Sequence, residues 1–255
     1  DSSTSRGLGD VYKRQRHIDP GQLAPFKSVI GILVSDRGFR QPLFYWKNMD
    51  GNIIGAQYKY IKDNVCQKRF LKNTDRSNSL WMTPIEGSKA LFVTEDPLDA
   101  IAHSQLFPGA RYAYLCTGGT STKAQREMIH SFSQKFKLPI ILGNDNDLAG
   151  QLENFKLAYH TANIEYAINS KTQRVLLTVN GAEREWGKDE IVAALQAVMK
   201  QRPNMILSIP WAKDWNDDLR SSKKSISLRI AENMVRAQIE TTKSEQRGMI
   251  AGKLP

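Results

Sequence analysis

Residues 90–99 read Ala-Leu-Phe-Val-Thr-Glu-Asp-Pro-Leu-Asp, an apolar run that leads directly into acids and a proline. The apolar part has the length of a strand. Asp96 is typical of a helix N-cap and Pro97 of the first helical position, so a helix is expected at residues 97–106. Glu95 then lies at the carboxyl end of a strand, where the ligand sites of open α/β sheets gather.

The same alternation of strand and helix continues toward the C-terminus. We expect strands at residues 90–94, 112–116, 138–142 and 205–209, helices at residues 121–132, 148–162 and 188–200, and a hairpin-bearing insertion at residues 167–187. Short connections between these elements predict a parallel α/β unit. Residues 117–120, Thr-Gly-Gly-Thr, form a glycine turn between a strand and a helix. The turn is a weak candidate for a phosphate loop, because it lacks the P-loop lysine pattern.

Two more acidic motifs follow strands of this unit. Residues 143–147 read Gly-Asn-Asp-Asn-Asp, and Asp145 and Asp147, two apart on an extended segment, point the same way. Both can therefore meet one magnesium ion, which prefers hard oxygen ligands. The alternative is an Asn/Asp turn in which Asp147 caps the next helix. Residues 213–218 read Lys-Asp-Trp-Asn-Asp-Asp, and alone they favour a solvated helix start with capping aspartates.

The N-terminal third has the pattern of a β-rich subdomain. We expect strands at residues 29–34, 43–46, 53–61 and 69–71, with a hairpin turn at Asp50-Gly51 and a linker at residues 84–88. This predicts a β-rich subdomain at residues 16–87, an α/β domain at residues 88–220, and a C-terminal helix and tail at residues 221–255. The C-terminal helix is expected at residues 225–239, where three apolar side chains lie four apart.

The first 15 residues are set aside from the fold. Residues 10–15, Asp-Val-Tyr-Lys-Arg-Gln, resemble the translation of a sequencing-library transposon end, so we interpret residues 1–15 as a non-native adapter segment. The same resemblance suggests a gene fragment, which leaves open an upstream zinc-binding or relaxase domain in the complete protein. The segment carries three basic and two acidic residues, so +9 of the chain's net charge of +10 belongs to the remainder.

Composition is that of a folded protein with a basic surface. Hydrophobic residues make up 40% and charged residues 24% of the chain, which excludes a wholly disordered or fibrous protein. No run approaches the ~20 apolar residues that cross a bilayer. Cys66 and Cys116 are too few for a disulfide framework or a four-ligand zinc site, so we expect the cytoplasm. The pI of about 9.6 favours a polyanionic partner, although a solvated lysine surface explains it equally well.

The order of motifs resembles the Toprim domain of primases, topoisomerases and related nucleases. That order is a strand with Glu95, a strand with Gly-Gly-Thr, a strand with Asp-x-Asp, and a strand with Lys-Asp, over about residues 89–219. The resemblance implies that Glu95 acts in proton transfer or as a metal ligand, and that Asp145 and Asp147 hold Mg²⁺ or Mn²⁺. Asp214 is then a supporting or second-ion acid. Primases usually have another aspartate where this chain has Asn216, which leaves a second metal site open.

Residues 46–59 resemble the β-rich subdomain that precedes the Toprim domain in plasmid, phage and mobile-element primase-like proteins. The resemblance implies nucleic-acid or nucleotide binding by four basic side chains, namely Lys59, Lys68, Arg69 and Lys213. The alternative for the first three is an ordinary exposed sheet with basic residues at its edges.

The activity implied is metal-dependent nucleotidyl transfer on single-stranded DNA, in which ribonucleotides are joined into RNA primers during plasmid, phage or conjugative replication. A helicase or relaxase is a conceivable partner. Two alternatives stay open. One is a Toprim nuclease, because the same acids can direct water at phosphorus. The other is a non-catalytic DNA-binding accessory of a relaxase, which Asn216 favours. None of the eight tyrosines stands in a context that marks a topoisomerase nucleophile.

The remaining histidines and tryptophans receive no function from the sequence. The four histidines show neither metal spacing nor a paired nucleophile. Four tryptophans are assigned to core or rim packing in preference to base stacking, namely Trp81, Trp186, Trp211 and Trp215.

Overall fold

The computed structural model describes residues 18–62 and 65–221. The adapter-like segment at residues 1–15 and the helix expected at residues 225–239 lie outside these ranges. None of the helices within them is long and apolar enough to cross a membrane.

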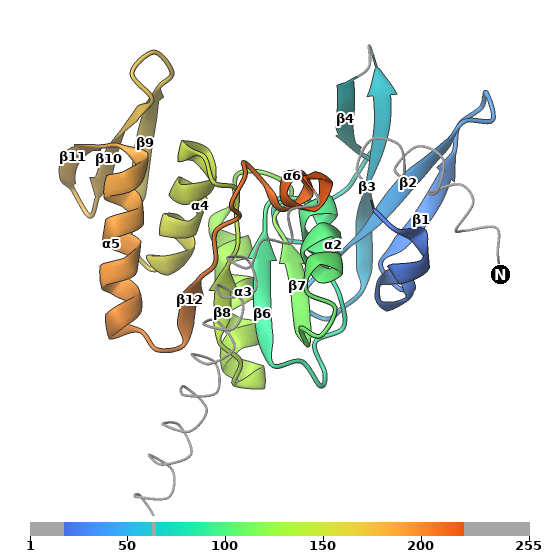
Figure 1. Ribbon diagram of the computed structural model, residues 1–255, viewed down its shortest axis with the longest axis horizontal. Coiled ribbons are helices and arrows are strands. Elements are labelled where there is room, and N and C mark those ends of the chain that lie inside the picture. The colour runs from blue at the N-terminus through green and yellow to red at the C-terminus, as the bar shows by residue number, and fades with distance from the viewer. Residues whose placement is uncertain (1–17, 63–64, 222–255) are drawn as a thin grey trace, which may run out of the picture.

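One nine-stranded sheet organises the molecule (Figure 1). Its strands are β1 (Ile30–Val34), β2 (Arg40–Lys47), β3 (Ile53–Lys62), β4 (Val65–Phe70), β5 (Leu80–Met82), β6 (Ala90–Thr94), β7 (Tyr112–Cys116), β8 (Ile140–Leu142) and β12 (Met205–Leu207). They lie in the order β12-β8-β6-β7-β5-β2-β3-β4, and β1 also pairs with β2. The pairs β12·β8, β8·β6 and β6·β7 are parallel, as predicted, and the N-terminal strands pair antiparallel.

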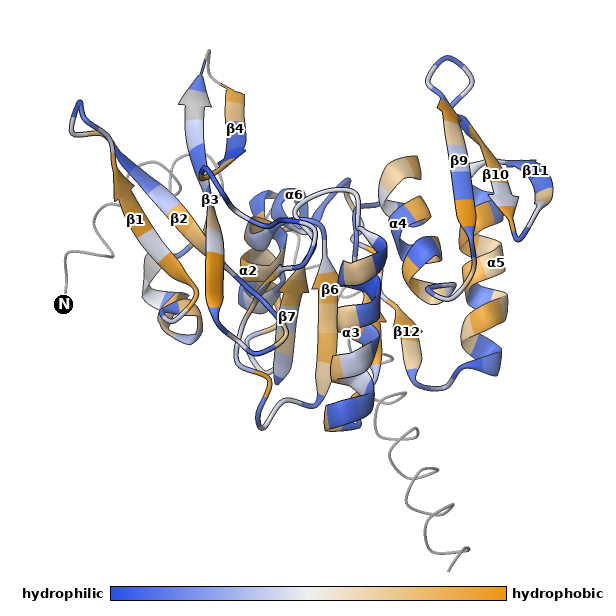
Figure 2. Cartoon of the chain, turned by 180° about the vertical axis from the view of Figure 1, so that it is seen from behind, coloured by the Kyte–Doolittle hydropathy of each residue, from blue (hydrophilic) through white to orange (hydrophobic). Residues whose placement is uncertain are grey.

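Helices cover both faces of the parallel strands, which confirms the predicted α/β fold class. They are α2 (Pro97–Leu106), α3 (Lys123–Phe136), α4 (Leu148–Ala158), α5 (Lys188–Gln201) and α6 (Trp215–Arg220). In β6, Phe92 packs on the side of α2 and α6, whereas Leu91 and Val93 pack on the side of α3, α4 and α5. Because both faces are covered, the strand is apolar throughout instead of alternating, as its colour in Figure 2 shows.

Short local signals set the ends of the helices next to the parallel strands. Asp96 caps α2 by accepting a hydrogen bond from the Leu98 amide at 3.0 Å, and Pro97 is the first helical residue, as predicted. Thr122 and Gln125 form a reciprocal capping box at the start of α3. The bounds of β6, α2 and β7 are those expected from the sequence, whereas α4 ends four residues earlier than expected, at Ala158.

The N-terminal strands continue the sheet of the α/β unit. The strand β5 was not predicted, and it joins the two parts because Trp81 pairs with Trp46 of β2 on one side and with Cys116 of β7 on the other. The predicted turn at Asp50-Gly51 is present, with Gly51 at a φ of 84° that favours glycine. The division between residues 16–87 and 88–220 stays a prediction.

The insertion before α5 is larger than the expected hairpin at residues 167–187. It forms a separate three-stranded antiparallel sheet of β9 (Ile164–Asn169), β10 (Arg174–Val179) and β11 (Ala182–Trp186). Val175 and Leu177 of β10 are buried in the core cluster that includes α4 and α5, and the insertion lies beside these helices in Figure 1.

Candidate functional site at the carboxyl ends of the parallel strands

The strands that precede the three acidic motifs are neighbours in the sheet, in the order β12-β8-β6. Val93 pairs with Leu142, and Leu142 pairs with Leu207, so the three chains leave the sheet at the same level. Adjacent strands lie ~4.8 Å apart. The structure therefore brings the ends that carry Glu95, the Asp145/Asp147 pair and Asp214 to one edge of the sheet.

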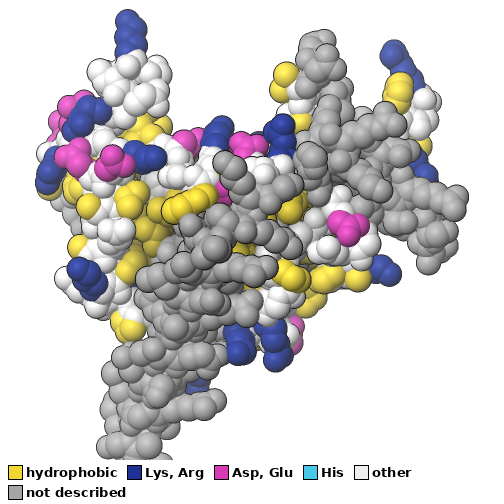
Figure 3. Space-filling view, viewed as in Figure 1, with side chains coloured by type: hydrophobic (Ala, Val, Ile, Leu, Met, Phe, Trp, Pro, Cys, Tyr) yellow, Lys and Arg dark blue, Asp and Glu magenta, His cyan; other side chains and the backbone are white. Residues whose placement is uncertain are grey.

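Acidic and basic side chains stand together on that edge. Figure 3 shows them along the top of the molecule, in the hollow between the insertion and the β3–β4 hairpin. Lys68 Nζ lies 3.1 Å from Glu95 Oε1, and Lys213 Nζ lies 3.8 Å from Asp147 Oδ2. Two of the predicted basic residues therefore contact two of the predicted acids directly.

Asp145 experiences the combined charge of the site. Burial is the largest cause that raises its pKa, to about 7, and the negative charges of Glu95, Asp214 and Asp147 raise it further, while Lys213 lowers it. Acids from all three strand ends therefore act electrostatically on one carboxyl group. Deprotonation of Asp145 adds a negative charge next to other negative charges. A bound cation would lower the repulsion between these carboxylates.

The loop that carries Asp145 and Asp147 is held by backbone contacts. Asp147 Oδ1 accepts a hydrogen bond from the Gly150 amide at 2.9 Å and so caps α4. Gln151 Nε2 donates to the Asp145 carbonyl at 2.9 Å. A Cβ on Gly150 would lie 2.3 Å from that carbonyl oxygen, so only glycine allows the first turn of α4 to approach so closely. The capping alternative for Asp147 is therefore confirmed, and its Oδ2 still faces Lys213.

The third motif is tied to the second. The Asn146 amide donates to the Lys213 carbonyl at 2.7 Å, and Asp214 caps α6 by accepting from the Asp217 amide, also at 2.7 Å. Asn216 is fully buried, and neither atom of its side-chain amide has a hydrogen-bond partner among the residues described. Asn216, which stands where the resemblance drawn from the sequence predicts an aspartate, is therefore inside the protein.

Lys59 and Arg69 lie elsewhere than the sequence suggested. Lys59 is buried and forms an ion pair with Asp96, so its ammonium is engaged inside the protein. Arg69 is exposed and stacks over the Tyr60 ring at 5.6 Å. Because neighbouring residues of a strand face opposite sides, Arg69 points away from the acids that Lys68 contacts. Lys68 and Lys213 therefore contact the acids at the exposed edge, whereas Lys59 contacts the acidic group from inside the protein, through Asp96.

Asp99 belongs to the acidic group although the sequence analysis did not select it. It is buried in the first turn of α2, and its pKa is raised well above the ordinary range by burial first and then by Asp96, Asp145 and Asp214. Its position in the first turn of α2, three residues after the capping Asp96, was the available signal. Asp99 therefore belongs to the same electrostatically coupled group of acids as Asp145, and its surroundings favour the protonated carboxyl.

Arg76 was also missed, and it borders the Gly-Gly turn. Its Nη2 donates to the Thr120 carbonyl at 3.2 Å, and a Cβ on Gly119 would lie 3.0 Å from the same nitrogen. Gly118 is at a φ of 75° and contacts the Trp46 ring. The turn is thus packed between an aromatic ring and a guanidinium, next to Lys68.

The acidic edge is chemically suited to a divalent cation but is not a closed cage. Within residues 18–62 and 65–221, no three His, Cys, Asp or Glu side chains already form a group that could hold an ion. The paired lysines explain this geometry, because Glu95 and Asp147 are turned toward Lys68 and Lys213. Carboxylate oxygens in negative excess fit Mg²⁺ or Mn²⁺, provided that these two side chains rotate toward Asp145.

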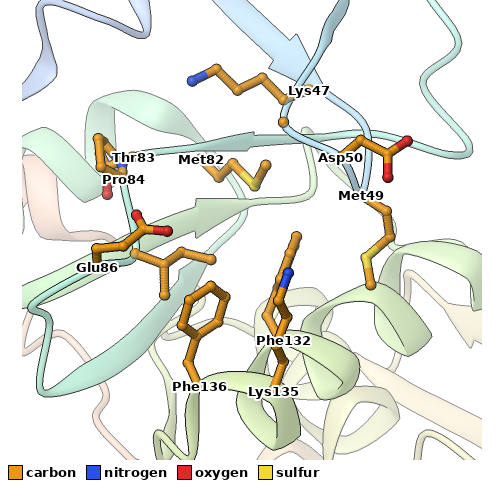
Figure 4. Close-up of a pocket in the computed structure, with 12 residues that line it drawn as sticks. Lys47, Met49, Asp50, Met82, Thr83, Pro84, Glu86, Phe132, Lys135 and Phe136 are labelled. Atoms are coloured by element: carbon orange, nitrogen blue, oxygen red, sulfur yellow. The ribbon is translucent and has the colours of Figure 1, made fainter.

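A pocket of about 280 Å³ lies apart from this edge. Figure 4 shows that Met49, Met82, Phe132 and Phe136 surround it, between the β2–β3 turn, the β5–β6 connection and α3. None of its lining residues is one of the predicted site residues. This pocket is therefore not part of the candidate site.

Three of the predicted packing tryptophans are confirmed. Trp81 and Trp215 are buried, and Trp186 packs against the core cluster of α4 and α5. The prediction is wrong for Trp211, whose side chain is 66% exposed. Burial at this position depends on the path of the loop between β12 and α6, which the local sequence does not reveal.

Comparison with known proteins finds similarity at the level of structure alone. No family model and no curated protein matches the sequence. The primase fragment of the bacteriophage T7 primase-helicase protein is 16% identical, with 83% of this chain and 70% of that chain covered and a TM-score of 0.47. The DnaG catalytic core is 13% identical, with 94% and 76% covered and a TM-score of 0.48. The RNA polymerase domain of Mycobacterium tuberculosis primase DnaG is 12% identical, with 90% and 79% covered and a TM-score of 0.49.

Proposed function

We propose that this chain is a metal-dependent nucleotidyltransferase that synthesises RNA primers on single-stranded DNA. The proposal rests mainly on the surroundings of Asp145. Acids at three adjacent strand ends all raise the pKa of this one carboxyl, so they lie close enough to act on one bound ion. Such a concentration of carboxylates at one edge of the sheet suits a bound divalent ion together with a phosphate chain.

The proposed roles follow from position. Asp145 and Asp147 hold Mg²⁺ or Mn²⁺, and Asp214 supports them from the neighbouring strand end. When bound, the ion neutralises phosphate charge and orients the attacking and leaving oxygens. Glu95 accepts the proton of the attacking sugar hydroxyl or contributes a further oxygen ligand.

The lysines have a second proposed role. Lys68 and Lys213 neutralise Glu95 and Asp147 in the free protein, and both side chains remain partly exposed. Once a cation replaces them as counter-charge, their ammonium groups are free to bind phosphate. Lys59 instead keeps Asp96 and the start of α2 in place through the buried ion pair. Arg69 contributes to polyanion binding from the opposite side of the β3–β4 hairpin.

The biological setting proposed is replication of a plasmid, phage or conjugative element, with a helicase or relaxase as partner. This part rests on the resemblance of residues 46–59 and of the motif order to primase-like proteins of such elements.

The test is incubation of the purified chain with single-stranded DNA, labelled ribonucleotides and Mg²⁺ or Mn²⁺. We expect short RNA products from the wild type, and none from Asp145→Ala or Glu95→Gln although both variants stay folded. Asp36→Asn, which alters an exposed acid of the β1–β2 loop, is the matched control and keeps full activity. Primer synthesis by either site variant contradicts the proposal.

The same assay separates the alternatives. Degraded DNA in place of RNA products identifies a phosphodiesterase that uses the same acids to direct water. DNA binding with neither product identifies a non-catalytic accessory.

A further inference from the structure

Trp211 is an exposed aromatic side chain on the loop that leads into the third acidic motif. Its side chain is 66% exposed, the largest exposed fraction among the exposed large hydrophobic residues of the described ranges. Exposure alone does not distinguish Trp211 from Phe39, which is 65% exposed. Trp211 differs in its position, because it lies four residues before the start of α6 and beside the third acidic motif, and tryptophan is enriched among the residues that dominate binding.

The loop around Trp211 is fixed on both sides. The Trp211 amide donates to Asp218 Oδ2 at 2.8 Å, and the Ala212 amide donates to Asp218 Oδ1 at 2.7 Å. Asp218 is itself buried. Two residues further on, the Lys213 carbonyl accepts from the Asn146 amide of the second acidic motif at 2.7 Å. The backbone that presents the indole is thus held between α6 and the loop of Asp145 and Asp147.

A basic residue, Lys213, follows Trp211 two positions later on the same loop. Two residues of chain span at most ~7 Å, so the backbone of Lys213 lies near that of Trp211. The Lys213 side chain is 63% exposed and reaches to 3.8 Å from Asp147. Trp211 and Lys213 therefore lie on one fixed loop, and the Lys213 ammonium reaches the carboxylate of Asp147 on the neighbouring β8–α4 loop.

We propose that Trp211 is a stacking platform for an unpaired base of single-stranded DNA, whose backbone phosphate is bound by Lys213. The inference rests on the proposed function, because it assigns the strand to the same acidic edge. Every base has a π-face, so stacking on an indole tolerates any sequence, and a nearby cation meets the backbone. A DNA strand bound in this way would lie next to Asp145 and Asp147.

The test compares a base-bearing and a base-free strand. Fluorescence anisotropy measures binding of a labelled thymidine oligonucleotide and of an abasic oligonucleotide with the same number of phosphates, in Mg²⁺ but without ribonucleotides, so that no primer is made. We expect Trp211→Ala to weaken binding of the thymidine strand by about 5-fold to 150-fold and to leave binding of the abasic strand unchanged. Trp211→Phe retains a ring and restores most of the affinity.

Phe39→Ala provides the matched control, because Phe39 is 65% exposed on the β1–β2 loop, and it leaves both affinities unchanged. Equal binding of the thymidine strand by the wild type and Trp211→Ala overturns the inference. An equal loss on both strands also overturns it, because the effect then does not depend on the base. Weaker binding of free ATP with unchanged strand binding overturns the assignment to a strand.

The result is independent of the test of activity. If no primers are synthesised but Trp211→Ala selectively weakens the base-bearing strand, the proposed function fails while the stacking site stands. If primers form and Trp211→Ala binds the thymidine strand normally, the stacking site fails while the proposed function stands.

Discussion

The carboxylate of Asp145 suits cation binding but lowers the stability of the metal-free folded protein. Its pKa is raised to about 7, with burial as the largest cause and the surrounding acids next. At pH 8 the carboxyl is ionised in both the folded and the unfolded protein. Ionisation costs more free energy in the folded protein, because the pKa is raised there, and the folded state is therefore less stable at pH 8 than it would be with an ordinary pKa at this position. Such a residue is retained for what it binds and not for what it contributes to folding.

Replacing Asp145 with asparagine should therefore stabilise the metal-free protein. We expect Asp145→Asn to raise the melting temperature in EDTA at pH 8 by about 2–4 °C, which is the shift that ~1 kcal/mol produces in a chain of this size. Differential scanning calorimetry measures it, with Asp36→Asn as the variant that should not change. A melting temperature at or below that of the wild type would show that the surrounding acids do not crowd Asp145.

His130 gives a pH dependence that is separate from the candidate site. It is buried and stacked on His160 with ring centroids 3.4 Å apart, and its Nε2 lies 2.9 Å from the Leu157 carbonyl oxygen. Burial is the largest cause that lowers its pKa, to about 4. The unfolded chain takes up this proton near pH 6.5, so the folded state loses stability as the pH falls from about 6.5 to 4.

His130→Gln should reduce that loss, because the amide can still donate to the Leu157 carbonyl but does not titrate. We expect the wild type to lose up to about 3 kcal/mol more than the variant between pH 7 and pH 4. Urea unfolding at several pH values measures the difference. Parallel stability profiles for the two proteins would rule out the assigned pKa.

At the scale of single elements, the sequence predicted the bounds of those strands and helices whose ends are set by neighbouring residues. The strands β6 and β7 and the helix α2 have the expected bounds, because an apolar run, a capping aspartate and a proline at N1 are local signals. The strand β5 was missed because three residues show no periodicity, and its pairing with β2 and β7 comes from distant parts of the chain. The third strand of the insertion was also missed, although the strands there have five or six residues and pair with their neighbours in the sequence.

The turn from β8 into α4 depends on Gly150. A Cβ there would lie 2.3 Å from the Asp145 carbonyl oxygen and 2.7 Å from the Asp145 nitrogen, and both are backbone atoms that no side-chain rotation can move. We expect Gly150→Ala to displace the acidic loop and to lower primer synthesis by at least about 10-fold, as misplacing reacting groups by ~1 Å does.

The control for Gly150→Ala is Ala149→Ser, which alters the exposed neighbour in the same helical turn and should retain activity. Steady-state rates of both variants, with circular dichroism to establish folding, decide the point. Full activity of Gly150→Ala would mean that the position of Asp145 is not set by this contact.

At the scale of the whole molecule, the sequence predicted which acids face one edge but not their surroundings. The order of strand-end motifs was sufficient to place Glu95, Asp145, Asp147 and Asp214 together, because carboxyl ends of parallel strands meet at one side of a sheet. The burial of Lys59 and the exposure of Trp211 were not predictable in this way. Both depend on how the N-terminal strands and the last loop pack on the parallel unit, which is a non-local property.

The central claim is that three strand ends form one divalent-cation site, and Mn²⁺ binding followed by electron paramagnetic resonance tests it most directly. We predict one saturable Mn²⁺ per chain, and affinity at least about 10-fold weaker in Asp145→Asn and in Asp147→Asn. Asp36→Asn should bind as the wild type does. Equal Mn²⁺ affinity in the wild type and the two site variants would contradict the claim.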